Sequence, residues 1–68
     1  MNRQPVTSSN LVSVGYDSAS GTLEVEFKDS TYQYYDVPES IYNGLMSASS
    51  KGSYLYQNIR DKFRYRKL

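Results

Sequence analysis

The amino-acid sequence predicts an α+β fold, namely a three-stranded antiparallel β-meander followed by two α-helices packed on one sheet face. Two patterns predict it. Within residues 11–37, apolar and polar residues alternate in three short runs that turn-forming residues separate. From Pro38 onward, the apolar residues recur at helical spacing instead. With 68 residues, the chain is long enough for one domain of this kind.

The first predicted strand covers residues 12–17. Val12, Val14 and Tyr16 alternate there with polar or small residues, so we expect these three side chains on one buried face. Ser13 then lies on the opposite, open face of the sheet. The strand ends in residues 17–21, which are rich in the turn formers Asp, Ser and Gly.

The second predicted strand shows the clearest alternation. Its apolar residues, within 23–27, alternate with Glu24 and Glu26, which therefore share the open face. Their Cα atoms would lie about 6.8 Å apart, close enough for paired acid–base chemistry. We interpret them instead as the solvated face of a half-buried strand, because charged strand faces are common. Asp29 and Ser30 then make a tight reversal.

The third predicted strand, residues 31–37, is rich in tyrosine. The alternation places Tyr32 and Tyr34 on the apolar face, and Gln33 and Tyr35 on the open face. Aromatic residues on a sheet can form a platform for RNA bases. The two helices must cover the apolar face, so we interpret Tyr32 and Tyr34 as core residues and expect Tyr35 to be the most exposed tyrosine.

Two helices follow the strands. Pro38 suits the first turn of a helix, and Glu39 complements the helix dipole there. A serine-rich segment, residues 47–50, separates this helix from the next and can supply the cap of the second helix. The apolar residues of the second helix recur every four residues up to Phe63.

Charge is distributed unevenly along the chain. The net charge is +1, but residues 1–50 carry two basic and six acidic residues, whereas residues 51–68 carry six basic residues and one acidic residue. Such polarisation indicates a charged partner. In the C-terminal tail, basic residues alternate with aromatic ones, a combination that neutralises phosphates and stacks on bases. The alternative is that the aromatic residues seal the edge of the core while the charges keep a small protein in solution.

Two functional hypotheses follow from these patterns. The first is weak, mostly electrostatic binding of nucleic acid, with RNA preferred, through the basic C-terminal helix and tail. Its residues are Lys51, Arg60, Lys62, Arg64, Tyr65 and Arg66. The alternative is binding of an unidentified protein on the open sheet face. Its residues are Ser13, Glu24, Glu26, Gln33 and Tyr35.

Composition argues against several other classes of protein. The chain has no cysteine and no histidine, so disulfides are absent and we expect no metal and no cofactor. Carboxylates, hydroxyls and amines alone offer little for a catalytic site, and we predict that the protein is not an enzyme. No apolar run approaches the ~18 residues of a membrane span, and the N-terminus lacks a signal-peptide core. We therefore expect a cytoplasmic protein with no membrane contact, in which residues 1–7 form a flexible arm.

Several short motifs occur in order along almost the whole chain. They are Ser8-Ser9-Asn10 with Val14-Gly15-Tyr16-Asp17, Leu23-Glu24-Val25-Glu26-Phe27, Tyr32-Gln33-Tyr34 with Val37-Pro38, and Ser50-Lys51-Gly52-Ser53-Tyr54 with Ile59-Arg60. With these motifs the chain resembles the KTSC domain, a short bacterial and phage module named for its occurrence at the C-terminus of some lysyl-tRNA synthetases. Ser30 departs from the family, which tends to have glycine in that turn.

The resemblance has implications for organisation and function. It implies that residues 8–68 form a single KTSC-like domain in a stand-alone protein of bacterial or phage origin. The family has no established activity, and its association with the synthetases suggests RNA binding. The second hypothesis then becomes a regulatory or interaction module of bacterial or phage origin.

Overall fold

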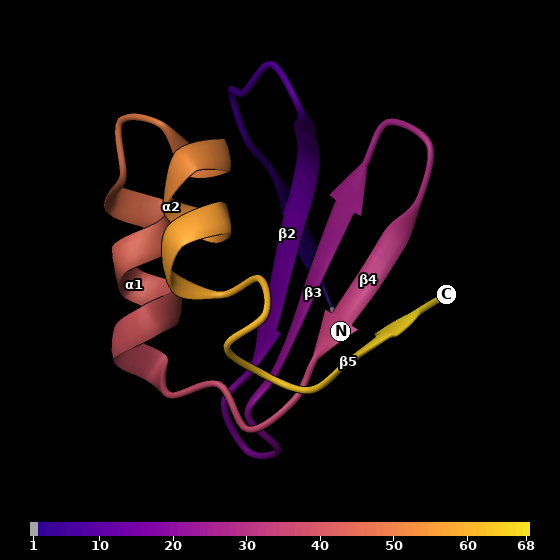
Figure 1. Ribbon diagram of the computed structural model, residues 1–68, viewed down its shortest axis with the longest axis vertical. Helices are drawn as coiled ribbons and strands as arrows, with labels where there is room; N and C mark the ends of the chain where they lie inside the picture. Colours follow the sequence, from indigo (N-terminus) through magenta and orange to yellow (C-terminus); the bar gives the residue numbers. More distant parts are fainter. Residues whose placement is uncertain (1) are drawn as a thin grey trace.

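The computed structural model describes residues 2–68 and shows a five-stranded antiparallel sheet with two helices on one of its faces (Figure 1). The strands are β1 (Arg3–Pro5), β2 (Leu11–Asp17), β3 (Thr22–Phe27), β4 (Thr31–Tyr34) and β5 (Tyr65–Lys67), and the helices are α1 (Glu39–Ser47) and α2 (Lys51–Asn58). The strands lie in the sheet in chain order. The predicted α+β class and the two helices are confirmed, whereas the prediction of only three strands is wrong.

The two additional strands, β1 and β5, form the edges of the sheet. Each has three residues, and all of these residues are exposed. Their sequences lack the apolar alternation that marks a half-buried strand, although β1 pairs with β2 and β5 pairs with β4. Strand β1 lies within residues 1–7, which the sequence assigned to a flexible arm, and Met1 lies outside the described residues.

Strand β2 departs from the predicted alternation at its start. The register shifts between Leu11 and Ser13, as in a β-bulge. Leu11 consequently takes the core position and is 2% exposed, while Val12 is 40% exposed. The prediction that Val12 is buried was wrong for this reason, whereas Val14 is fully buried as predicted.

The hydrophobic core lies between the helices and the inner face of the sheet. Its buried residues are Leu11, Val14, Leu23, Val25, Tyr34, Val37, Leu45, Leu55 and Ile59. Tyr34 is 4% exposed, and Tyr32 packs against this core while remaining partly exposed. The interpretation of these two tyrosines as core residues is therefore confirmed for Tyr34, while Tyr32 lies at the border of the core.

Both helices are short and depend on packing for their stability. Ser50 caps α2, because its hydroxyl accepts a hydrogen bond of 3.4 Å from the backbone N–H of Ser53. A Cβ atom at Gly44 of α1 would collide with the hydroxyl and ring of Tyr54 in α2, so the glycine permits close approach of the helices. In the described part of the chain, neither helix is long and apolar enough to cross a membrane.

The turn after α2 directs the chain to the edge of the sheet. Asp61 adopts a left-handed backbone conformation with φ 65°, which reverses the chain direction. Beyond the turn, the Arg64 carbonyl accepts a hydrogen bond of 2.9 Å from the N–H of Tyr35, and the Leu68 N–H donates one of 2.8 Å to the Thr31 carbonyl. The C-terminal residues are thus held alongside β4.

Candidate functional site

The far face of the sheet, which points away from the helices, carries a row of residues that crosses all five strands. The strand register places in this row Arg3, Gly15, Glu24, Gln33 and Arg66. Side chains on one face of neighbouring strands lie close enough to interact. The row therefore links both edge strands to the centre of the sheet.

Glu24 is at the centre of the contacts on the far face. Its Oε1 accepts a hydrogen bond of 2.9 Å from Gln33 Nε2, and Gln33 Oε1 accepts one of 3.1 Å from the Tyr35 hydroxyl. The other carboxylate oxygen of Glu24, Oε2, lies 3.2 Å from Nε of Arg3. The Glu24 side chain is only 14% exposed, so a largely covered carboxylate has a partner at each oxygen.

Glu26 extends this network toward the other end of the strands. Its Oε1 accepts a hydrogen bond of 2.7 Å from the Ser13 hydroxyl and lies 3.8 Å from Nη1 of Arg3. Ser13 is 8% exposed, so it offers little surface to a partner.

The residues predicted for a protein-interaction face do lie together on the far face. They are Ser13, Glu24, Glu26, Gln33 and Tyr35. The expectation that Tyr35 is the most exposed tyrosine is wrong, because Tyr35 is only partly exposed, whereas Tyr56 and Tyr65 are 65% and 56% exposed. Sequence reasoning missed Arg3, because it assigned residues 1–7 to a flexible arm. With Arg3 in place, these polar groups already bind one another.

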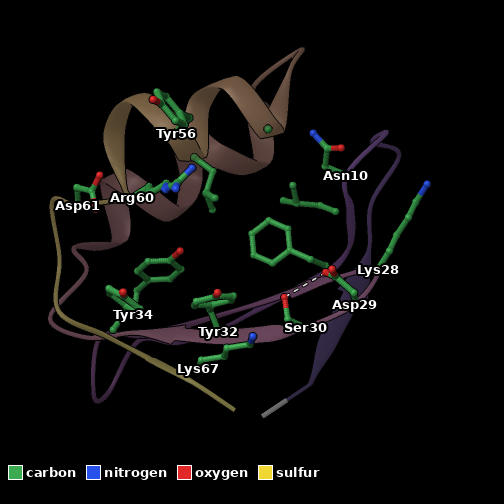
Figure 2. Close-up of a pocket in the computed structure, with 15 residues that line it drawn as sticks. Asn10, Lys28, Asp29, Ser30, Tyr32, Tyr34, Tyr56, Arg60, Asp61 and Lys67 are labelled. Carbon is green, nitrogen blue, oxygen red and sulfur yellow. Dashed lines mark hydrogen bonds between the residues drawn. The ribbon is translucent and has the colours of Figure 1, made fainter.

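A groove of about 740 Å³ lies on the helix side of the sheet, between α2 and the edge formed by β4 and β5. Figure 2 shows its two sides: Tyr56 and Arg60 come from α2 and the turn after it, whereas Tyr32 and Tyr34 come from the sheet. Asn10, in the loop before β2, marks its other end. The groove exists because the sheet continues to β5, beyond the area that the helices cover.

Aromatic rings form the sheet side of the groove. The ring centre of Tyr65 lies 5.7 Å from that of Tyr32 and 5.9 Å from that of Tyr34. Phe27 meets Tyr32 edge to face at 5.7 Å. Such contacts stabilise aromatic clusters beyond the area that they bury. Tyr65 is 56% exposed, so it presents to solvent an aromatic ring whose orientation is restricted by Tyr32 and Tyr34.

Charged residues surround these rings. Arg60 Cζ lies 5.2 Å from the centre of the Tyr56 ring, a cation–π contact. Lys67 is the cross-strand neighbour of Tyr32 and lines the groove. Within residues 2–68, neither Arg60 nor Lys67 has an ion-pair partner. Lys28, Asp29 and Asp61 also line the groove, so its border is of mixed charge.

The environment of Tyr34 reflects its place at the bottom of the groove. Burial raises the pKa of its hydroxyl, and the neighbouring Tyr32 raises that pKa further, whereas Arg60 lowers it. The hydroxyl therefore stays protonated at neutral pH.

The structure divides the residues that were predicted to contact nucleic acid. Arg60 and Tyr65 meet at the groove. Arg66 is the cross-strand neighbour of Gln33 and belongs to the far face. Arg64 Nη2 lies 3.0 Å from Oδ2 of Asp36, and both side chains are largely exposed.

The remaining two predicted residues lie away from the floor of the groove. Lys51 is the first residue of α2, and its Nζ donates a hydrogen bond of 3.1 Å to the Ala48 carbonyl. Lys62 lies in the turn between α2 and β5. Sequence reasoning missed Lys67, although the alternation of Tyr65, Arg66 and Lys67 would have placed it on the same side as Tyr65.

The described residues offer little for a metal ion. In residues 2–68, no group of three or more His, Cys, Asp or Glu side chains could hold one. Glu24 and Glu26, the pair considered for acid–base chemistry, share their contacts with Arg3 instead. The chemistry that the groove offers is stacking, cation–π contact and electrostatic attraction.

Both the sequence and the structure of this chain match known proteins. The sequence model of the KTSC domain matches residues 7–63. A protein of Tsukamurella paurometabola is 37% identical over 62 residues, which cover 90% of this chain and 92% of that protein. A lysine–tRNA ligase of Trichormus variabilis is 41% identical over 54 residues, which cover 78% of this chain but only 10% of the ligase. The crystal structure of a KTSC domain protein from Yersinia pestis has a TM-score of 0.96 and 46% identity, and covers 98% of this chain and 96% of that one.

Proposed function

The chain belongs to the KTSC domain family, as its sequence resemblance predicted, and we propose that it is a non-enzymatic module that binds single-stranded nucleic acid weakly in the cytoplasm, with RNA preferred. The observation that carries this proposal is the groove, where exposed aromatic rings lie beside Arg60 and Lys67. Proteins that bind single strands combine cations along the backbone path with aromatic faces on which bases stack.

The charge distribution supports the same proposal. Residues 51–68 carry six of the eight basic residues of the chain, and Arg60 and Lys67 have no ion-pair partner within residues 2–68. A cation without an ion-pair partner can neutralise a phosphate without breaking a salt bridge of the folded state. One relative is named as a lysine–tRNA ligase, which suggests that the domain can occur in a protein that acts on RNA.

The number of available cations sets the strength of binding. Three cations line the groove, Lys28, Arg60 and Lys67, and about three phosphate contacts would give a slope of log affinity against log salt of about −2 for a single strand. The affinity is then expected to fall by roughly 10- to 20-fold between about 50 mM and about 200 mM salt. Binding of this kind is weak at physiological salt.

Fluorescence anisotropy of a short labelled RNA, measured across this range of salt, tests the proposal. We expect saturable binding at low salt that weakens with the stated slope. The same sequence as DNA should bind less tightly, and the same sequence as duplex RNA should bind least, because its bases are already stacked. Absence of binding at about 50 mM salt would overturn the proposal, since phosphate attraction is strongest there.

Protein binding on the far face is the second candidate function. The observation in its favour is that its five predicted residues lie on one face. The observation against it is that their polar groups already bind one another and Arg3, so a partner would have to replace these contacts. Glu24→Lys with Glu26→Lys would abolish capture of a protein partner in pull-downs if this face were the binding surface.

A further inference from the structure

Building on the proposed function, we infer that the groove is a nucleobase site, in which one unpaired base of a single strand stacks on the ring of Tyr65. Arg60 and Lys67 then contact the phosphates on either side of that base. The occupant is thus a base together with its flanking backbone, not an isolated phosphate.

The size of the groove fits such an occupant. Its volume of about 740 Å³ lies in the range of pockets that hold small organic ligands. Figure 2 shows Arg60 between the helix and the sheet, on the side of Tyr34, while the Tyr56 ring lies farther from the sheet, so an aromatic ligand would meet the tyrosine rings of the sheet and the guanidinium of Arg60.

Tyr65 is prepared for stacking by its neighbours. Its ring is tilted by 44° to that of Tyr32 and by 41° to that of Tyr34, at 5.7 Å and 5.9 Å between ring centres. These contacts restrict its orientation, while 56% of the residue stays exposed. A ring that is held in place before binding loses little side-chain entropy when a base stacks on it.

The mixed charge of the groove indicates a base rather than a bare anion. Asp29 and Asp61 line it together with the cations Lys28, Arg60 and Lys67. A phosphate inside the groove would be repelled by the two carboxylates, whereas a neutral base would not. The edges of a base also carry N–H donors, from which a carboxylate can accept hydrogen bonds.

An acidic peptide is the competing occupant, because cations and aromatic rings would attract it as well. It would be opposed by Asp29 and Asp61, and its aliphatic or carboxylate side chains would gain less from a floor of tyrosine rings. The observations therefore favour the base.

The test compares two ligands of equal length and charge: a six-nucleotide RNA of mixed sequence and an abasic oligomer with the same phosphate backbone. For the wild-type protein we expect the RNA to bind roughly 5- to 150-fold more tightly, the effect of one stacked base. Tyr65→Leu keeps an apolar contact with Tyr32 and Tyr34 but removes the stacking face, so this difference should largely disappear. Binding of the abasic oligomer should be unchanged.

Two further variants serve as controls. Tyr65→Phe keeps the ring and should retain the preference for bases, while Tyr35→Leu changes a tyrosine of the far face and should leave it intact. Intermolecular nuclear Overhauser effects between base protons and the Tyr65 ring are expected only for the base-containing ligand.

The outcomes separate this inference from the proposed function. If wild-type protein binds both ligands equally, or if Tyr65→Leu retains the preference for bases, the nucleobase site is overturned while electrostatic RNA binding stands. If neither ligand binds at low salt, the proposed function fails as well. Tighter binding of an acidic peptide of equal charge than of the RNA would identify the competing occupant and overturn the inference.

Discussion

The two faces of the sheet use their polar residues in opposite ways. On the far face, Glu24 is 14% exposed and contacts both Gln33 and Arg3. On the helix side, Tyr65 is 56% exposed and lines a groove together with Lys67, which has no ion-pair partner within residues 2–68. Both surfaces look polar in the sequence. The difference teaches that a binding surface is indicated by groups without partners, not by polarity.

The same comparison separates stability from binding. The network on the far face ties β1 to the centre of the sheet, and its groups are already paired. The groove has a buried part, centred on Tyr34, and an exposed part, centred on Tyr65. We therefore expect changes in the exposed part to alter ligand binding, and changes in the far face or in Tyr34 to alter folding.

The largest expected effect is the loss of stability in Tyr34→Ala. Removing this buried ring should lower the free energy of unfolding by about 3–5 kcal/mol, as for large aromatic truncations in cores. Gln33→Ala, one residue earlier and on the opposite face, is the matched control and should cost about 1 kcal/mol. Urea denaturation measures both. Equal losses would contradict the assignment of the core to the helix side.

The next effect concerns RNA affinity and compares two pairs of charge reversals. Arg60→Glu with Lys67→Glu changes the groove, whereas Arg64→Glu with Arg66→Glu makes the same change of net charge away from it. The first pair should weaken RNA binding on the order of tenfold or more at low salt, because phosphate contacts are lost. The second pair should have a clearly smaller effect. Anisotropy measures both, and equal effects would mean that only net charge matters.

Removal of Arg3 should have a smaller effect, and on stability alone. Arg3→Ala leaves the carboxylate of Glu24 without its cation, and we expect a loss of about 0.5–1.5 kcal/mol in the free energy of unfolding. Asp36→Ala breaks an ion pair between largely exposed side chains and should cost about 0.5 kcal/mol or less. RNA affinity should be unchanged in Arg3→Ala beyond the small effect of net charge. Strongly weakened binding would place the ligand on the far face.

The smallest expected effect is the loss of stability at alkaline pH. Because the pKa of Tyr34 is raised in the folded state, the unfolded chain releases this proton at a lower pH than the folded chain does. The contribution of Tyr34 to the free energy of unfolding should therefore stay constant below about pH 10, the ordinary range for tyrosine, and decrease as the pH rises through the folded-state pKa. Tyr34→Phe should reduce this decrease. Tyr16, whose pKa burial also raises, contributes to the remainder.

Much of the fold could be predicted because strong periodic patterns mark its centre. The alternation in β3 placed Leu23 and Val25 in the core and Glu24 and Glu26 on the far face, as the structure shows. The edge strands could not be predicted in this way, because they bury no side chains and therefore carry no apolar pattern. The bulge that exposes Val12 is likewise a local shift of register that alternation alone does not indicate.

The candidate site could be predicted only in part. The far-face residues were found together because period-2 alternation determines on which side of a strand a residue lies. The groove depends instead on the turn at Asp61, after which the chain pairs with β4 as β5, so that Arg60 and Lys67 line one space. A count of charges in residues 51–68 does not show that Arg66 points to the opposite face.

The most direct test of the central claim is an NMR titration of the isotope-labelled protein with a short mixed-sequence RNA at low salt. The side chains of β4 and β5 alternate between the two faces residue by residue, so each shifted side-chain signal can be assigned to one of them. We predict that the largest shifts occur at the groove residues Tyr32, Arg60, Tyr65 and Lys67, and that the side chains of Arg3, Glu24 and Gln33 stay unperturbed. Shifts concentrated on Arg3, Glu24 and Gln33, with none in the groove, would contradict the account.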